Sequence, residues 1–248
     1  MILEFKLFML VEVCANSLQS AVNAERAGAS RIELCSELAV GGITPSYGLL
    51  KSIRNHINIP VHVLIRPRSG DFSYSKEEFE IMMADIALCV ELGFDGIVSG
   101  VLNKDYTLDV QRTKQLKEAS EKLKFTFHRA FDWVKDPHKT LLQLETFDVD
   151  SILTSGQQKS ALEGIDLLTE LHQKASKCSI MPGGGIRPEN VHVFRETGFS
   201  AIHLSGTKFI ETLAIIPNVS MNSPTYLKDS ATAVTHTHTI QEIVNAVK

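Results

Sequence analysis

Short apolar runs alternate with amphipathic stretches along almost the whole chain. The runs are rich in β-branched residues and about five residues long, which is typical of buried strands. They span residues 9–14, 31–35, 61–65, 96–100, 125–128, 151–155, 179–183 and 201–205. The stretches between them carry apolar residues at helical spacing, as in 17–28, 75–93 and 160–175. Helix N-caps are expected at Ser17, Ser75 and Ser160.

Eight strands, each followed by helix-like sequence, predict an α/β fold with a single (β/α)8 barrel, the TIM barrel. A doubly wound sheet is the alternative. We expect residues 1–248 to form one domain with its core over about 9–210. A long loop is predicted over 214–238, and a terminal helix over 240–248.

Strand alternation predicts which side chains face the barrel axis, because alternate residues point to opposite sides of a sheet. In VEVC and IELC, Val11, Val13, Ile32 and Leu34 should face the helices. The inward set is then Glu12, Cys14, Glu33, Cys35, His62, Leu64, Arg66, Thr126, His128, His203 and Ser205. Barrel interiors are usually apolar, and barrel active sites lie at the carboxyl ends of the strands. Each single polar residue could instead be a salt-bridged filler, but the set as a whole indicates a functional site.

Composition narrows the function classes. The chain has 248 residues, of which 44% are hydrophobic and 22% charged, and its formal net charge is -4. A negative net charge does not favour binding to nucleic acid, whose backbone is also negatively charged. No apolar run reaches the roughly 18 residues of a membrane span, and charges interrupt the opening MILEFKLFML. The four cysteines do not form a short disulfide scaffold, so we expect them to be reduced and the protein to be cytoplasmic.

Four residues are candidates for catalysis: Glu12, Glu33, Arg66 and His128. His128, in FTFHRAFD, could act as an acid or a base near neutral pH. Arg66, in IRPRSGDF, presents a planar donor suited to carboxylate or phosphate. Arg129 and Asp132 are expected to pair and to brace the turn after the fifth strand.

A second set is predicted to bind a small anionic ligand: Arg68, Gly183, Gly184, Gly185, His203 and Ser205. The glycines follow the seventh strand and Ser205 ends the eighth, where barrels commonly bind phosphate through backbone N–H groups. Glycine runs also serve ordinary turns.

Cys14 and Cys35 end neighbouring strands, which lie about 4.8 Å apart. Two thiolates at this spacing suit Cu(I). The alternative is that both are small buried residues, as free cysteines usually are.

The stretches VEVCANS, RIELCSEL, GGITPS, IRPRSGDF, TFHRAFD, LTSGQ, ALEGI and PGGGI occur in this order between Leu10 and Lys208. In this respect the chain resembles the CutC family, named for copper homeostasis. The resemblance implies a cytoplasmic TIM barrel, a homo-oligomer (dimer or tetramer) and a role in copper handling. The cysteines proposed as Cu(I) ligands in some members match Cys14 and Cys35. Lys208, in SGTK, departs from the small residues expected there.

Two hypotheses therefore stand side by side. The first is a copper homeostasis protein that holds Cu(I) between Cys14 and Cys35 without chemistry on a substrate. The second is an enzyme that acts on a small anionic metabolite by acid–base chemistry. The second accounts for Glu12, Glu33 and His128, which have no obvious role in a two-thiolate copper site. Whether the protein is an enzyme stays open at this point.

Overall fold

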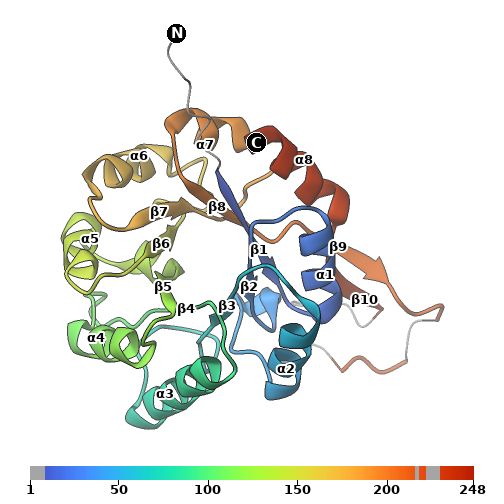
Figure 1. Ribbon diagram of the computed structural model, residues 1–248, viewed down its shortest axis with the longest axis horizontal. Helices are drawn as coiled ribbons and strands as arrows, with labels where there is room; N and C mark the ends of the chain where they lie inside the picture. The colour runs from blue at the N-terminus through green and yellow to red at the C-terminus, as the bar shows by residue number, and fades with distance from the viewer. Residues whose placement is uncertain (1–8, 216–217, 222–229) are drawn as a thin grey trace.

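The computed structural model describes residues 9–215, 218–221 and 230–248, and it confirms the predicted barrel (Figure 1). Eight parallel strands surround the axis in the order β7-β6-β5-β4-β3-β2-β1-β8. An isolated parallel bridge between Gly183 and His203 joins β7 to β8 and so closes the ring. The barrel strands are β1 (Leu10–Ala15), β2 (Arg31–Leu34), β3 (Val61–Leu64), β4 (Gly96–Ser99), β5 (Lys124–Phe127), β6 (Ser151–Thr154), β7 (Ser179–Pro182) and β8 (Ala201–Leu204).

The helices form the outer ring (Figure 1). They are α1 (Leu18–Arg26), α2 (Tyr47–His56), α3 (Lys76–Glu91), α4 (Val110–Ala119), α5 (Pro137–Glu145), α6 (Ile165–Lys174), α7 (Val191–Thr197) and α8 (Thr237–Val247), with short 3-10 helices at Leu38–Val40 and Arg129–Trp133. Ser17 and Ser75 cap α1 and α3 as predicted. The predicted cap at Ser160 is wrong, because α6 begins at Ile165 after Gly164. Among the helices that the structure describes, none combines the length and apolarity that a bilayer crossing requires.

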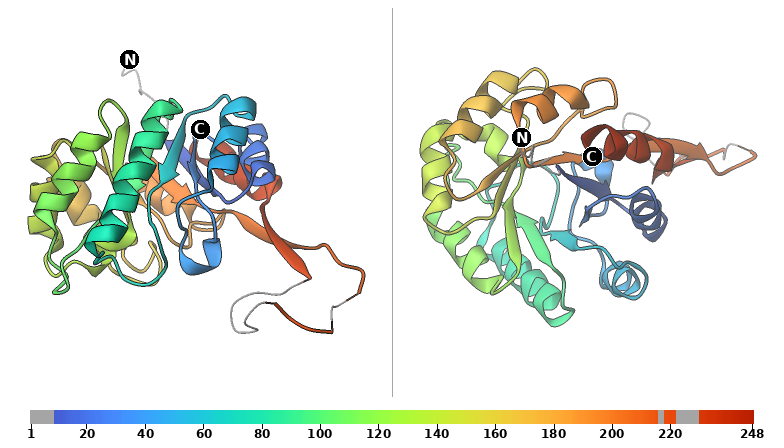
Figure 2. Two further views of the ribbon diagram at one scale, coloured as in Figure 1. Left: turned by 90° about the horizontal axis from the view of Figure 1, so that it is seen from below. Right: turned by 45° about the horizontal axis from the view of Figure 1, so that its top comes forward.

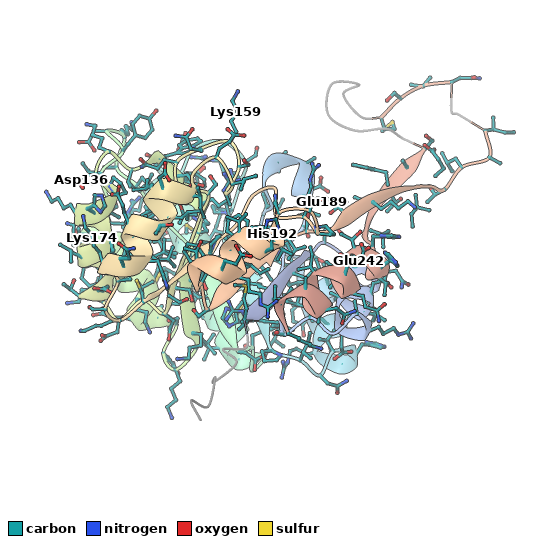
Figure 3. The ribbon with its side chains drawn as sticks, turned by 90° about the horizontal axis from the view of Figure 1, so that it is seen from above. Asp136, Lys159, Lys174, Glu189, His192 and Glu242 are labelled. Carbon is teal, nitrogen blue, oxygen red and sulfur yellow. The ribbon has the colours of Figure 1, made fainter. Side chains whose placement is uncertain are left out.

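The main hydrophobic core lies between the strands and this helical ring. Val11, Val13, Ile32 and Leu34 are buried in it, which is the orientation that strand alternation predicts. Charged side chains occupy the outer surface, for example Lys174 on α6 and Asp136 at the N-cap of α5 (Figure 3). The barrel axis therefore holds a separate set of side chains, and it is this set that builds the site.

A two-stranded hairpin interrupts the barrel between β8 and α8. Its strands are β9 (Thr207–Glu211) and β10 (Ala231–Thr235), which pair antiparallel from Thr207–Thr235 to Glu211–Ala231. Figure 2 shows it projecting away from the barrel. The structure differs here from the predicted loop over 214–238, since β10 and the start of α8 lie inside that segment. Pro217 and Pro224, which are typical of a loop, belong to the predicted segment but lie outside the described residues. The terminal helix predicted over 240–248 coincides with the later part of α8, which begins earlier, at Thr237, and ends at Val247.

Candidate functional site

A buried charged cluster lies inside the barrel where β1, β2 and β8 meet. Glu12 is fully buried; its Oε2 accepts a hydrogen bond from Nε of Arg31 at 2.5 Å, and its Oε1 lies 2.9 Å from Nδ1 of His203. Burial opposes ionisation, but Arg31 and His203 outweigh it and lower the pKa of Glu12 to about 2. An ionised carboxylate only accepts hydrogen bonds, so Nδ1 of His203 donates.

The pKa values of His203 and Glu33 are raised, in contrast to that of Glu12. Burial alone would lower the pKa of His203, but the carboxylates of Glu33 and Glu12 outweigh it and raise that pKa above its usual value. For Glu33, burial is the largest effect, and with the charge of Glu12 it raises the pKa. The Oε2 atom of Glu33 lies 3.9 Å from Nδ1 of His203. Glu33 and His203 therefore bind protons more readily than the free side chains would, whereas Glu12 binds them less readily.

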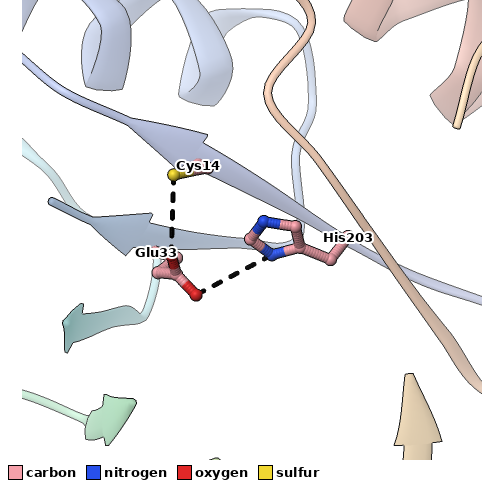
Figure 4. A group of neighbouring side chains, drawn as sticks. All are labelled: Cys14, Glu33 and His203. Atoms are coloured by element: carbon pink, nitrogen blue, oxygen red, sulfur yellow. Dashed lines mark hydrogen bonds and ion pairs between the residues drawn. The ribbon is translucent and has the colours of Figure 1, made fainter. Parts of the chain in front are cut away.

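Cys14 completes a group of candidate metal ligands with Glu33 and His203 (Figure 4). One potential ligand atom from each of the three lies within 4.8 Å of the others. Cys14 Sγ donates to Oε1 of Glu33 at 3.5 Å, and it lies 3.3 Å from Sγ of Cys35. The hydrogen bond with Cys35, followed by burial, raises the pKa of the Cys14 thiol well above its usual value. Sulfur and imidazole donors suit a soft ion, and two adjacent thiols suit Cu(I), so the residues fit the predicted metal.

An open cavity of about 1460 Å³ lies over this cluster, at the carboxyl ends of the strands. Cys14, Glu33 and His203 form part of its lining. The predicted residues Arg66, His128, Gly184, Gly185 and Ser205 also line it. Glu12 and Cys35 do not, because they lie beneath the lining residues with which they pair. Glu189 and Glu242, both exposed, contribute acidic side chains to the lining (Figure 3).

His128 follows β5 and lines the cavity while being only 5% exposed. Its Nδ1 accepts a hydrogen bond from the backbone N–H of Ala130 at 3.2 Å. Burial, together with the charge of Arg66, lowers the pKa of His128 to about 3. The imidazole is therefore neutral at neutral pH. Its ring packs against Phe72, with 4.9 Å between the ring centroids.

Arg66 forms hydrogen bonds with the loops that follow β2 and β3 at the cavity. Its Nη1 donates to the carbonyl oxygens of Val40 and Gly42 at 2.8 and 2.9 Å, and its Nη2 donates to that of Gly70 at 2.8 Å. The guanidinium also lies over the ring of Phe72, with Cζ 5.1 Å from the centroid. Arg66 is thus held rigidly, and only part of its hydrogen-bonding capacity is used by these carbonyls.

Arg129 and Asp132 pair as predicted, with Nε of Arg129 2.7 Å from Oδ2 of Asp132. Asp132 also accepts from Thr154 Oγ1 at 2.5 Å and from Ser155 N at 2.9 Å. Arg129 Nη2 donates to Ser155 Oγ at 2.8 Å. These bonds tie the turn after β5 to the end of β6, which is the bracing role expected from the sequence.

Three residues singled out from the sequence lie elsewhere. Arg68 is not among the residues that line the cavity; its Nε donates to Oε1 of Glu78 at 2.5 Å. Gly183 is also outside the lining, and its backbone N–H donates to the carbonyl of Thr154 at 2.9 Å. Lys208 is exposed on β9 and does not line the cavity.

Sequence reasoning missed two kinds of residue in the site. Arg31 shares the inward face of β2 with Glu33, so the alternation rule could have found it. Gly96 and Gly100 on β4 and just after it make room for imidazoles: a Cβ at Gly96 would lie 2.5 Å from the ring of His62, and one at Gly100 would lie 2.7 Å from Nδ1 of His128. No local signal in the sequence distinguishes such glycines from turn glycines.

Comparison with known proteins gives consistent results. The CutC family model matches residues 9–208. The family protein CutC of Enterobacter sp. (strain 638) is 46% identical over 200 residues, which cover 81% of each chain. That of Klebsiella pneumoniae (strain ATCC 700721 / MGH 78578) is 45% identical over 216 residues, covering 86% of this chain and 87% of the relative.

Solved structures agree with the sequence comparison. A crystal structure from Streptococcus agalactiae that carries the name copper homeostasis protein CutC is 37% identical. It superposes with a TM-score of 0.75 over 79% of this chain and 97% of that one. Thiamine phosphate pyrophosphorylase from Pyrococcus furiosus, at 13% identity and a TM-score of 0.57 over 98% of this chain and 96% of that one, shares the fold alone. The chain belongs to the CutC family.

Proposed function

We propose that the protein is a cytoplasmic copper homeostasis protein that binds Cu(I) through Cys14 and Cys35, with His203 as a further ligand. The observation that carries the proposal is the 3.3 Å separation of the two Sγ atoms from adjacent strands. Family membership supports it, because a related structure carries the copper homeostasis name. Soft thiolates select Cu(I) over the hard cations that carboxylates prefer.

Binding at this site would release protons. The pKa of the Cys14 thiol is raised well above its usual value, mainly by its hydrogen bond with Cys35 and by burial. A metal ion binds the thiolate and not the thiol, so a bound cation displaces the proton. The apparent affinity for Cu(I) should therefore rise with pH. Glu33, whose Oε1 accepts from Cys14, lies close enough to compensate the charge of the ion.

An anaerobic Cu(I) competition titration tests the proposal. Wild-type protein should bind one ion tightly, and both Cys14→Ser and Cys35→Ser should lose that binding. Cys89→Ser and Cys178→Ser are matched controls, because both are buried in the main core. The proposal is wrong if the wild type binds no better than the Cys14→Ser and Cys35→Ser variants.

A second candidate function is an enzyme that acts on a small anionic metabolite, and the size of the cavity favours it. A volume of about 1460 Å³ far exceeds the space that one ion needs. Glu33 has a raised pKa and is suited to hold a proton at the floor of the cavity, and Arg66 adds positive charge to its wall. A thermal-shift screen of phosphorylated and carboxylated metabolites tests this. The idea fails if no compound raises the melting temperature of wild-type protein more than that of a Glu33→Gln variant.

We also propose that the protein assembles with copies of itself through the β9–β10 hairpin. Phe209 is 62% exposed and Ile210 49% exposed on this projection, and such apolar exposure is typical of interfaces. Light scattering coupled to size exclusion should report a dimer or tetramer for the wild type. A Phe209→Ser, Ile210→Ser variant should elute as a smaller species, and a wild-type monomer would contradict the proposal.

A further inference from the structure

Three buried polar atoms in the cavity wall have no hydrogen-bond partner among the described residues. They are Oε2 of Glu33, Nε of Arg66 and Nε2 of His128, and the three side chains come from the ends of β2, β3 and β5. All three residues line the same cavity and are each 5% exposed. A buried polar group without a partner destabilises the folded protein. Their concentration around one cavity points to a ligand that satisfies them.

The hydrogen-bonding character of His128 follows from its surroundings. Nδ1 accepts from the backbone of Ala130, so in the neutral ring the proton resides on Nε2. Nε2 is therefore a donor. The ring has little freedom to turn away, because Gly100 lies against its Nδ1 edge and Phe72 packs on its face. The donor is held in place before any ligand arrives.

Arg66 supplies a second fixed donor. Its two terminal nitrogens are engaged by the carbonyls of Val40, Gly42 and Gly70, which leaves Nε–H without a partner among the described residues. Phe72 lies against both donors. Its ring centroid is 5.1 Å from Cζ of Arg66 and 4.9 Å from the ring centroid of His128. One cationic donor and one neutral donor thus flank the same aromatic ring in a buried corner of the cavity.

We propose that Arg66 and His128 form a subsite for the carboxylate group of a small organic anion. Each N–H would donate to one carboxylate oxygen, and the ring of Phe72 would pack on the adjoining carbon atoms. Phe72 is half-buried on the loop after β3 and itself lines the cavity. The unpartnered Oε2 of Glu33 would face a hydroxyl or carbonyl group further along the same molecule.

This subsite does not depend on copper binding at Cys14 and Cys35. It rests on the second candidate function, that the cavity takes a small anion, and extends it by naming the group that is recognised. A carboxylate is favoured over phosphate because two single donors match its two oxygens, whereas phosphate sites usually draw on several backbone N–H groups. Phosphate is therefore a comparison probe.

The test uses the full chain labelled with ¹⁵N-histidine and titrated with pyruvate, and then with inorganic phosphate. The Nε2 resonance of His128, identified by its loss in His128→Phe, should shift saturably with pyruvate. Calorimetry should show affinity about tenfold weaker in His128→Phe, as expected for loss of a hydrogen bond to a charged group. Gly100→Ala, which forces the ring aside without removing it, should weaken binding as well. Arg68→Gln, on the same loop but outside the cavity lining, is the matched control and should bind pyruvate as the wild type does.

The outcomes separate this inference from the second candidate function. If pyruvate binds but the His128 resonance and the affinity of His128→Phe are unchanged, the subsite is wrong while the cavity remains a binding site. A shift produced by phosphate and not by pyruvate would overturn the assignment to carboxylates. If neither probe gives heat or a resonance shift, both the subsite and the binding of small anions fail.

Discussion

Nδ1 of His203 on β8 lies 2.9 Å from Oε1 of Glu12 on the adjacent strand β1, and the other carboxylate oxygen of Glu12 accepts a hydrogen bond from Arg31. Glu12 therefore links the guanidinium of Arg31 and the imidazole of His203 inside the barrel, beneath the cavity. Its place in this cluster suggests an anchor that holds His203 in position, not a group that touches a ligand.

Glu12→Gln should destabilise the protein by about 3–5 kcal/mol, because it leaves Arg31, whose side chain is only 12% exposed, without its carboxylate partner. Urea unfolding followed by circular dichroism measures this loss. A Glu12→Leu, Arg31→Met variant, which removes both charges of the ion pair, should recover part of this loss, because only His203 then lacks its partner. If the single variant unfolds at the wild-type urea concentration, the pair contributes nothing.

Stability should fall as the pH is lowered below 6.5. The pKa values of His62 and His128 are lowered from 6.5 to about 4 and about 3 in the folded state, mainly by burial. At a pH below 6.5 but above the folded-state pKa, each histidine is protonated in the unfolded chain and neutral in the folded chain, so acid favours unfolding. A pKa difference of one corresponds to about 1.4 kcal/mol, so the two histidines together should cost several kcal/mol by pH 4.

Urea midpoints measured from pH 7 to pH 4 check this dependence. A His128→Phe variant should show a shallower decline, with His56→Gln, at an exposed position, as the control substitution. His203 acts in the opposite direction, because its pKa is raised: its contribution is complete below 6.5 and is lost as the pH rises through the folded value. A midpoint that does not change between pH 7 and pH 4 would contradict the neutral, buried state of His128.

Asp132→Ala should cost about 3 kcal/mol, since it removes charge-assisted hydrogen bonds from Arg129, Thr154 and Ser155. Thermal unfolding measures the change. Asp71→Ala is the matched control: this aspartate also pairs with an arginine, but its side chain is 58% exposed, so the effect should be below about 1 kcal/mol. Equal effects in the two variants would show that burial of Asp132 adds nothing.

Gly100→Ala should destabilise the protein by about 1–3 kcal/mol, because the added methyl group overpacks the site occupied by the His128 ring. Gly48→Ala is the control. Its Cβ would meet nothing closer than 4.0 Å and it lies near the start of α2, so the change should be neutral or slightly stabilising. Comparable melting temperatures for both variants would mean that the ring moves aside without cost.

Much of this arrangement could be predicted from strand alternation alone. The period of two placed Glu12, Glu33 and His203 on the inward face, and it brought Cys14 and Cys35 together, because neighbouring parallel strands fix the spacing of their side chains. These inferences depend only on local geometry that every strand of the barrel shares.

The rest depends on contacts between distant segments. Arg68 follows the same strand as Arg66, but Glu78 lies at the start of α3, where its carboxylate completes a capping box with Ser75 and binds Arg68. The glycine run after β7 indicated an anion loop, yet the N–H of Gly183 is used in the ladder to β6. Such pairings are invisible in a single sequence because they depend on which loop approaches which.

The two glycines that make room for imidazoles also limit how this barrel can be altered. Position 96 is paired with position 62 and position 100 with position 128, each pair across adjacent strands. A larger residue at either glycine fits without strain only where a smaller residue replaces its histidine partner. A redesign that enlarges position 96 or position 100 should therefore also place a smaller side chain at position 62 or position 128, respectively.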